Sequence, residues 1–491
     1  MKKYILIFLL FSVSAILYLS FPIRHAEHFV SIRDKKFFLD DKEFYPVTLN
    51  YMVSVQTDEQ ESELWPCAYT GYNKGFKNLY TTKDSCLMQL KADMELIKEM
   101  GFNTVRLVSI GEEIVNKKTG ELSVGAAVGN GRKTALPLSN NKNYDNYFNA
   151  LDELFTIANN AGLKVIFLTR MSADVRSTEY HLMKVTSHFK DNPSILAYDF
   201  FNEPLYFDSL EHTKEQVYNT VKRWNKIVKM YAPHQLSTIG LAGIREVFEW
   251  DPNILDVDFL SFHPYEYEPE MVRNEMYWYY KELKKPWMLG ETAIPADNDS
   301  VSYLEQNKFA NKTLKQAYNC GAMGYSWWQY KDVEWYSFHA NFMGVVTLDG
   351  NTRTKQNDVV IGTVKPVADE FRNYKPGEQK DTCSCMTNYY NYTKFRDSRI
   401  VGKLITADGD PIAGGVIIAW NQWWSKSYIT ITKADGSFEI LGNFPFYHWM
   451  ASATEYSMVR GDVLPDTAKV TAGIPTMNLG MLQIKKLSFV K

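Results

Sequence analysis

The chain has 491 residues and a formal net charge of −3. Its 54 basic and 57 acidic residues form no long runs of one sign, which argues against a nucleic-acid surface or a polybasic lipid-binding surface. At roughly 100–200 residues per domain, the length predicts two domains.

The amino terminus combines a basic start with an apolar stretch. Met1, Lys2 and Lys3 precede residues 4–21, which carry no charge, and this order resembles a secretion signal. The stretch is also at the lower length limit for a membrane span, and no clear cleavage site follows it, so cleavage and anchoring both stay open. Residues 1–28 are therefore predicted to be a signal peptide or a membrane anchor. We expect a secreted, periplasmic or membrane-anchored cell-surface protein.

The cysteines give a weaker signal about the compartment. The chain has 5 cysteines, so at least one is left without a partner inside the chain. Cys67 and Cys86 lie in one loop region and can form a disulfide if the compartment is oxidising. No Cys/His spacing resembles a zinc site, and we predict neither a metal nor an organic cofactor.

The central part of the chain alternates strand patterns with helix patterns. A short hairpin over residues 37–47 leads into the first buried strand, which is expected to end at Asn50. Helical spacing occurs in four stretches: 87–100, 144–160, 215–230 and 303–318. Short β-rich runs occupy eight stretches: 47–50, 104–108, 165–169, 195–201, 237–240, 259–263, 287–290 and 323–328. Strands that alternate with helices in this way predict an α/β fold, a parallel (β/α)₈ TIM barrel.

Two glutamates stand at the ends of predicted strands. Glu203, in Asn202-Glu203-Pro204, follows the fourth apolar run, and Glu291 follows the seventh. Chemistry in such barrels sits at the carboxyl ends of the strands. A pair of carboxylates supplies both the proton donor and the nucleophile or base that cleavage of a glycosidic bond needs. The pair therefore predicts a glycosidase, with Glu203 as general acid/base and Glu291 as nucleophile.

The pattern changes after the barrel. Residues 29–375 form the predicted catalytic domain, and Pro376-Gly377 opens a polar linker over 376–397. From residue 398 to 491, strand patterns are separated by Asp-Gly turns at 408–409 and 435–436, with no helical stretch. This pattern predicts a small all-β sandwich. Trp420, Trp423, Trp424 and Tyr428 could stack on sugars or fill the core of this module, and the sequence leaves both interpretations open.

Five motifs occur in one order along the barrel region: Gly-Phe-Asn-Thr-Val-Arg-Leu at 101–107, Asn-Glu-Pro at 202–204, Ser-Phe-His-Pro-Tyr at 261–265, Leu-Gly-Glu at 289–291 and Gly-Tyr-Ser-Trp-Trp at 324–328. On these motifs, residues 30–375 resemble clan A of the glycoside hydrolases, which are retaining (β/α)₈ enzymes. Glycoside hydrolase family 5, the family of cellulases and mannanases, is the most similar. The last module resembles the carboxypeptidase-regulatory-like sandwich through Gly402 and residues 408–414 and 432–438.

The resemblance also implies roles around the two glutamates. The charge of Glu291 is expected to raise the pKa of Glu203, and their close approach implies retention through a covalent glycosyl-enzyme. Asn202 would hydrogen-bond the 2-hydroxyl of the sugar, and Arg106 would keep Glu291 ionised. For Arg106 a purely structural salt bridge stays open.

Three further residues complete the predicted substrate site. His263 and Tyr265 match the strand-six pair of the family, with Tyr265 donating to the nucleophile and His263 near the acid/base. A buried core histidine is the alternative for His263. Trp328 would form the floor under the sugar, although alternation along the strand leaves Trp327 open for the same place.

The sequence thus predicts an exported, retaining β-glycoside hydrolase that acts on a β-mannan or β-glucan type of poly- or oligosaccharide. Transglycosylation through the same intermediate is one alternative, and a non-catalytic carbohydrate-binding barrel is another. The expected partner is a carbohydrate, not a nucleic acid. Oligomeric state and the choice of sugar stay open.

Overall fold

The computed structural model describes residues 28–57, 62–66, 82–108, 114–116, 121–124, 136–137, 141–169, 171–208, 210–265, 269–296, 301–333, 339–378, 382–384 and 395–490. The apolar segment of the amino terminus lies outside these ranges. Among the helices they contain, none has the length and apolar character needed to cross a membrane.

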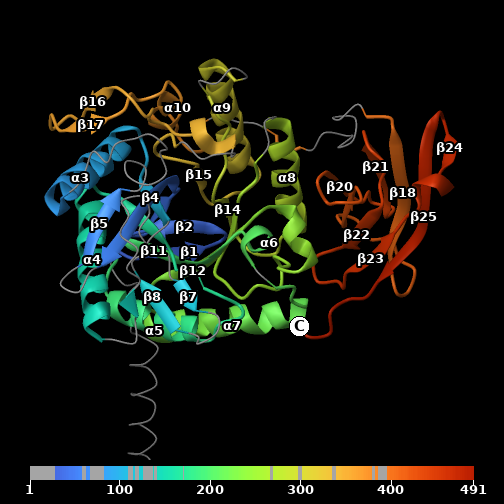
Figure 1. The fold of residues 1–491 in the computed structure, drawn as a ribbon, viewed down its shortest axis with the longest axis horizontal. Coiled ribbons are helices and arrows are strands. Elements are labelled where there is room, and N and C mark those ends of the chain that lie inside the picture. Colours follow the sequence, from blue (N-terminus) through green and yellow to red (C-terminus); the bar gives the residue numbers. More distant parts are fainter. Residues whose placement is uncertain are drawn as a thin grey trace, which may run out of the picture.

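A parallel barrel forms the larger part of the molecule (Figure 1). Its eight strands are β4 (Val47–Thr57), β6 (Thr104–Val108), β10 (Lys164–Leu168), β11 (Ile195–Asn202), β12 (Leu236–Leu241), β13 (Leu260–Phe262), β14 (Trp287–Leu289) and β15 (Tyr325–Trp327). They pair in the order β14-β13-β12-β11-β10-β6-β4-β15. The two edges meet where the Met323 amide donates to the Trp287 carbonyl at 2.8 Å and the Leu289 amide donates to the Gly324 carbonyl at 3.2 Å. The predicted (β/α)₈ fold is confirmed.

Helices cover the outside of the barrel. They are α3 (Lys83–Glu99), α4 (Asn141–Asn160), α5 (Ser177–Phe189), α7 (Lys214–Tyr231), α8 (Pro269–Glu282), α9 (Tyr303–Asn319) and the short α10 (Ala368–Arg372). Thr82, Thr213 and Ser302 each close a capping box at the start of their helix, so local sequence fixes where these helices begin. The fifth crossover is different, because between β12 and β13 it contains only a 3₁₀ helix, η1 (Ile244–Phe248).

A three-stranded sheet closes the amino-terminal end of the barrel. It consists of β1 (Val30–Arg33), β2 (Lys36–Leu39) and β3 (Lys42–Phe44) and contains the predicted hairpin. Val30 and Phe37 are buried against the starts of the barrel strands, in one apolar cluster with Phe259 and Met323. This end of the barrel is therefore a packed apolar plug.

The first barrel strand is longer than predicted. It does not end at Asn50 but continues to Thr57 and pairs antiparallel with β5 (Ser62–Pro66). Residues 51–55 are all buried, because β5, α3 and α4 cover this extension. The smaller elements are β7 (Ile114–Asn116), β8 (Glu121–Val124), β9 (Leu136–Pro137), α6 (Pro204–Phe207), η2 (His339–Phe342), β16 (Asn351–Arg353) and β17 (Val359–Ile361).

The last part of the chain is a sandwich of two four-stranded sheets. One sheet contains β21 (Ser437–Gly442), β18 (Ser398–Thr406), β25 (Ile474–Ile484) and β24 (Lys469–Thr471). The other contains β20 (Ser427–Ile431), β19 (Val416–Trp420), β22 (His448–Ser452) and β23 (Val459–Asp462). Trp423 and Trp424, in the β19–β20 loop, are 78% and 48% exposed. They are not core residues, and sugar stacking by this loop stays a prediction.

The sandwich packs on the barrel where the fifth helix would lie. Strands β19 and β22 contact η1, and Val416 and Ile418 belong to the same apolar core as the barrel. Polar groups cross this interface as well. The buried Lys214 ammonium of α7 donates to Asp251 at 2.9 Å and to the Ser452 hydroxyl at 3.0 Å. Since a buried charge is tolerated only when it is paired, this contact fixes the sandwich against the barrel.

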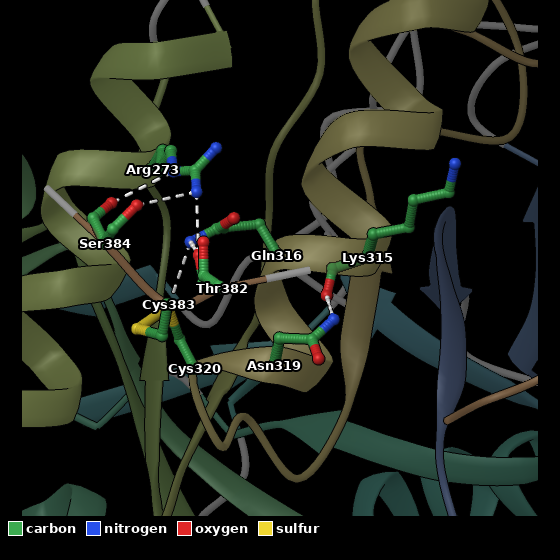
Figure 2. The surroundings of a disulfide bond; sticks show 8 residues. All are labelled: Arg273, Lys315, Gln316, Asn319, Cys320, Thr382, Cys383 and Ser384. Carbon is green, nitrogen blue, oxygen red and sulfur yellow. Dashed lines mark hydrogen bonds between the residues drawn. A yellow bond between two sulfur atoms is a disulfide. The ribbon is translucent and has the colours of Figure 1, made fainter. Parts of the chain in front are cut away.

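A disulfide between Cys320 and Cys383 ties the segment after the barrel to the end of α9 (Figure 2). The same segment is held by Arg273 of α8, which donates to the Thr382 carbonyl at 2.7 Å and to the Ser384 hydroxyl at 2.8 Å. The predicted partner of Cys86, Cys67, lies outside the described residues, so that pairing stays a prediction.

Candidate active site

Glu203 lies at the junction between strand β11 and helix α6. Its backbone is left-handed, with φ at 48°, which is uncommon for a residue with a side chain. The Glu203 amide donates to the Gly240 carbonyl of β12 at 2.8 Å. Pro204 then starts α6, a position where proline needs no hydrogen-bond partner. This sharp turn places the carboxyl group over the end of the barrel.

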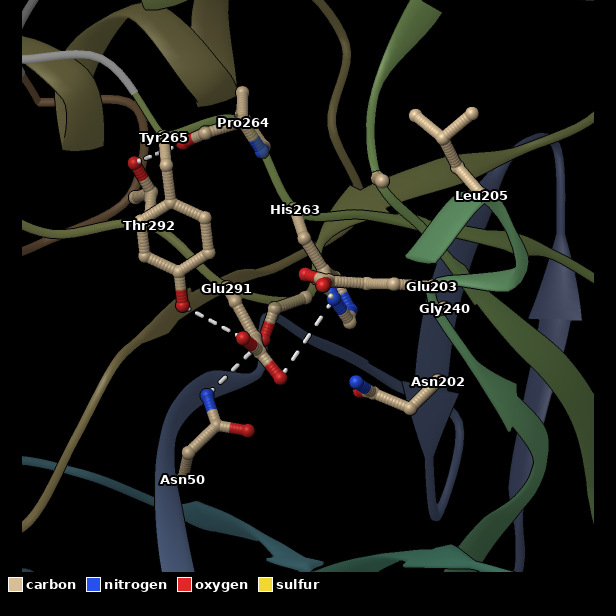
Figure 3. Close-up of polar contacts among 12 residues, drawn as sticks. Asn50, Asn202, Glu203, Leu205, Gly240, His263, Pro264, Tyr265, Glu291 and Thr292 are labelled. Carbon is tan, nitrogen blue, oxygen red and sulfur yellow. Dashed lines mark hydrogen bonds and ion pairs between the residues drawn. The ribbon is translucent and has the colours of Figure 1, made fainter. Parts of the chain in front are cut away.

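Glu291 lies two residues after the end of strand β14 and is almost completely buried. The Tyr265 hydroxyl donates to Glu291 Oε2 at 2.6 Å, and the Arg106 guanidinium donates to Oε1. Figure 3 shows Tyr265 and Glu291 facing each other across the end of the barrel. Both oxygens of this carboxyl group thus accept a hydrogen bond.

Arg106 connects the strands beneath the two glutamates. Besides Glu291, its guanidinium donates to Asp199 Oδ2 at 2.8 Å, to Asn50 Oδ1 at 3.0 Å and to Asn202 Oδ1 at 2.8 Å. Asn50 in turn donates to the Gly290 carbonyl at 3.1 Å, directly before Glu291. Neither Asn50 nor Asp199 was predicted as a site residue. Their signal in the sequence is weak: each is a polar residue next to apolar ones within a predicted strand.

His263 lies between the two carboxyl groups. Its Nδ1 is 3.0 Å from Glu203 Oε1 and 3.6 Å from Glu291 Oε1. The imidazole is packed against backbone at Gly240 and Gly290, where an added Cβ would come within 2.9 Å of the ring. Burial lowers the pKa of His263 to about 4, so the ring is neutral at neutral pH. It is a buried residue that also touches the acid/base candidate.

The surroundings of the two glutamates separate their acidities. Burial raises the pKa of Glu203 to about 7, and the Arg106 charge only partly opposes this rise. The cause differs from the expectation, since burial and not the charge of Glu291 dominates. Burial also raises the pKa of Glu291, but the Arg106 charge and the Tyr265 hydroxyl oppose it. With a cation and a hydroxyl donating to its oxygens, Glu291 is the better placed of the two to ionise.

The two tryptophans of strand eight point in different directions. Trp327 is fully buried, and its indole donates to the Met343 carbonyl at 2.9 Å. Trp328 is half-buried and packs on Val108, the last residue of β6, and on Met52, its partner in β4. Of the pair, Trp328 is the one that packs near this end of the barrel, and its contact with a sugar stays a prediction.

Within the described ranges, two groups of side chains have donor atoms close enough to share a cation. One group is Glu203, His263 and Glu291, and the other is Asp174, Asp208 and His212, each within 4.8 Å. In the first, Arg106 already supplies the positive charge beside Glu291. In the second, His212 Nε2 lies 3.3 Å from Asp174 and 3.4 Å from Asp208, which is ion-pair geometry for a protonated imidazole.

The model of the cellulase family, glycosyl hydrolase family 5, matches residues 66–331. The chain belongs to this family. It is therefore a member of a family of glycoside hydrolases, as predicted. No curated protein matches the sequence.

Similar solved structures include other glycosidases. A GH2 β-galacturonidase from Eisenbergiella tayi bound to galacturonate is 13% identical, with a TM-score of 0.45 and coverage of 71% of this chain and 55% of that one. A Bacteroides uniformis β-glucuronidase 2 is 12% identical, with a TM-score of 0.46 and coverage of 92% of this chain and 48% of that one. The exo-β-1,4-mannosidase Op5Man5 from Opitutaceae bacterium strain TAV5 is 16% identical, with a TM-score of 0.47 and coverage of 70% of this chain and 61% of that one. The chain spans about half to three fifths of these proteins, and similarity this low says nothing about its substrate.

Proposed function

We propose that this family 5 enzyme is a retaining β-glycosidase, with Glu203 as general acid/base and Glu291 as nucleophile. The observation that carries the proposal is the short separation of the two carboxyl groups, which bring one oxygen each within 4.8 Å. Retaining enzymes hold their carboxyl groups about 5–5.5 Å apart, whereas inverting enzymes leave about 6.5–9.5 Å for a water molecule.

The chemistry follows from the two environments. In the first step, a Glu291 oxygen forms a bond to the anomeric carbon while the bond to the leaving oxygen breaks, and Glu203 gives that oxygen its proton. In the second step, the Glu203 carboxylate takes a proton from water, whose oxygen displaces Glu291 from the sugar. Each step inverts the anomeric carbon, so the product keeps the β configuration.

The substrate site uses the remaining residues of the network. Asn202 accepts from Arg106 through Oδ1, so its amide NH₂ remains to donate to a sugar 2-hydroxyl. Trp328 offers an aromatic surface on the same face. We propose a β-mannan or β-glucan type of chain as substrate, on the breadth of the family.

The test is a screen of the protein lacking residues 1–28 on β-mannans, β-glucans, xylans and aryl β-glycosides, with Glu291→Ala beside it. We expect release of reducing sugar on at least one substrate and a loss of about 10⁴-fold or more in the variant. Product configuration is read by NMR in the first minutes. An α-configured first product, or full activity in the variant, would contradict the proposal.

We also propose that the enzyme works outside the cytoplasm, as a secreted, periplasmic or surface-anchored protein. The Cys320–Cys383 disulfide supports this, because disulfides persist in oxidising compartments. Thiol labelling of the native protein, isolated from cells under acid quench, should leave both cysteines unlabelled. Labelling of both would argue for a reducing compartment.

A further inference from the structure

One buried carboxyl group outside the catalytic pair touches the acid/base turn. Glu246 lies in η1 and is 2% exposed. A single oxygen of Glu246, Oε1, accepts from the Leu205 amide at 3.1 Å and from the Ala242 amide at 3.0 Å. Leu205 stands two residues after Glu203, and Ala242 directly follows strand β12. Glu246 therefore links the end of the fifth strand to the acid/base turn.

The Leu205 amide has a special place in this turn. Helix α6 has only 4 residues, and Pro204 has no N–H to offer. The amides of Tyr206 and Phe207 both donate to the Glu203 carbonyl, at 2.9 and 3.1 Å. The Leu205 amide is thus the donor of the first turn that needs a partner from elsewhere in the chain. Figure 3 shows Leu205 on α6, which starts after Glu203.

The backbone of Glu203 is consequently held on both sides. On its amino side it donates to Gly240 of β12, and on its carboxyl side the next amide is bonded to Glu246. A left-handed residue of this kind persists only where its neighbours enforce it. Without Glu246, the turn loses one of these two attachments.

The sandwich supports the element that carries Glu246. η1 replaces the fifth barrel helix, and its residues Ile244 and Val247 lie in one apolar core with Val416 and Ile418 of β19. A five-residue 3₁₀ helix has little stability of its own, so its position depends on this packing.

We propose that Glu246 is a positioning residue that holds the acid/base Glu203 in its working geometry, through the Leu205 amide. The inference rests on the proposed function, because it needs Glu203 to act as the proton donor. Burial raises the pKa of Glu246 to about 8, so the group is largely protonated at neutral pH and accepts through a carbonyl oxygen. Glutamine offers the same oxygen at the same place.

The experiment compares leaving groups. For Glu246→Ala, Glu246→Gln and the wild-type full chain, kcat/KM is measured on a 2,4-dinitrophenyl β-glycoside, which departs without a proton, and on the methyl β-glycoside or disaccharide of the same sugar, which needs one. A misplaced acid slows only the second reaction. A displacement of a catalytic group by about 1 Å lowers the rate by about 10²-fold. We expect Glu246→Ala to lower the ratio of the second kcat/KM to the first by about 10- to 100-fold, with Glu246→Gln within about threefold of wild type.

This ratio does not depend on how much of the variant is folded, since both rates fall together with the active fraction. A matched control is Glu249→Ala, because Glu249 directly follows η1 and also accepts from a backbone amide. That amide belongs to His212, at 2.6 Å, which is farther from Glu203 along the chain. It should leave the ratio unchanged.

An unchanged ratio in Glu246→Ala, or an equal fall in Glu246→Ala and Glu249→Ala, would overturn the positioning role while leaving the proposed function intact. If Glu203→Ala had the same ratio as the wild type, Glu203 would not be the acid. The positioning role of Glu246 would then be refuted as well.

Discussion

The two ends of the barrel are filled with opposite kinds of side chain. At the amino-terminal end, apolar residues such as Val30, Phe37 and Phe259 form a dry plug. At the carboxyl-terminal end, Arg106, Asp199 and Glu291 are equally buried, yet each is charged or ionisable. Burial of apolar surface stabilises a fold, whereas burial of ionisable groups has a cost that pairing only partly offsets. The amino-terminal end therefore stabilises the fold, and this offsets the cost of burying the ionisable groups of the carboxyl-terminal end.

The largest effect on stability is expected at the plug. Phe37 is fully buried and meets Phe259 edge to face, with ring centroids 5.1 Å apart. Phe37→Ala should lower the free energy of unfolding by about 3–5 kcal/mol, measured by chemical denaturation. The kcat/KM of the folded variant should stay within about twofold of wild type, because the ring lies at the far end from the glutamates. A variant that loses activity but keeps its stability would break the comparison.

A smaller effect, on activity and not on stability, is expected from Tyr265→Phe. This change removes the hydroxyl that donates to Glu291 at 2.6 Å. A hydrogen bond to a charged group is worth about 1.5–3 kcal/mol, so kcat/KM should fall by about 10- to 100-fold. Tyr265 also lowers the pKa of Glu291, so the acidic limb of the pH profile should move to higher pH.

Tyr325→Phe is the control for that variant. Its hydroxyl pairs with Thr313 at 2.8 Å, between the barrel and α9. This control should lose some stability and no activity. If Tyr265→Phe kept full activity, the catalytic end would not depend on its buried donors.

The sequence was sufficient for the barrel and for the position of the two glutamates. Strand periodicity located the strands, and the two glutamates lie one and two residues after the ends of theirs. It did not reveal that Asn50 and Asp199 bond to Arg106, because these contacts depend on the stagger between strands. Arg106 pairs in register with Asn50 on one side and with Ile166 on the other, while Asp199 is one strand farther on. Alternation along a strand gives the face of a residue but not its height in the barrel.

Contacts between distant parts of the chain were also beyond the sequence. Lys214 and Ser452 meet across the interface although they are 238 positions apart. Nothing local to η1 indicates that a β-sandwich covers it, or that Glu246 reaches the acid/base turn. Likewise, the number of cysteines could not indicate that Cys320 pairs with Cys383.

The smallest effect, and the one that sharpens the comparison most, is a pH dependence set by Glu203. The acid must be protonated to act, and burial raises its pKa to about 7. Activity on substrates with poor leaving groups should therefore fall as the pH rises through about 7. The alkaline limb of kcat/KM should be absent for the wild-type enzyme on a 2,4-dinitrophenyl glycoside, because this leaving group departs without a proton. An alkaline limb that persists on that substrate would belong to another group.

The same shift should appear in stability. A carboxyl group whose pKa is raised by folding binds its proton more tightly in the folded state, so its contribution is fully present below the unfolded value near 4.5 and is lost as the pH rises through about 7. Above that pH the buried carboxylate costs on the order of 3 kcal/mol. Glu203→Gln should thus be more stable than wild type at pH 8 and nearly equal to it at pH 4. Equal stability at both pH values would mean that this end of the barrel is not destabilised by its acid, and the contrast with the apolar plug would then rest on Arg106 and its partners alone.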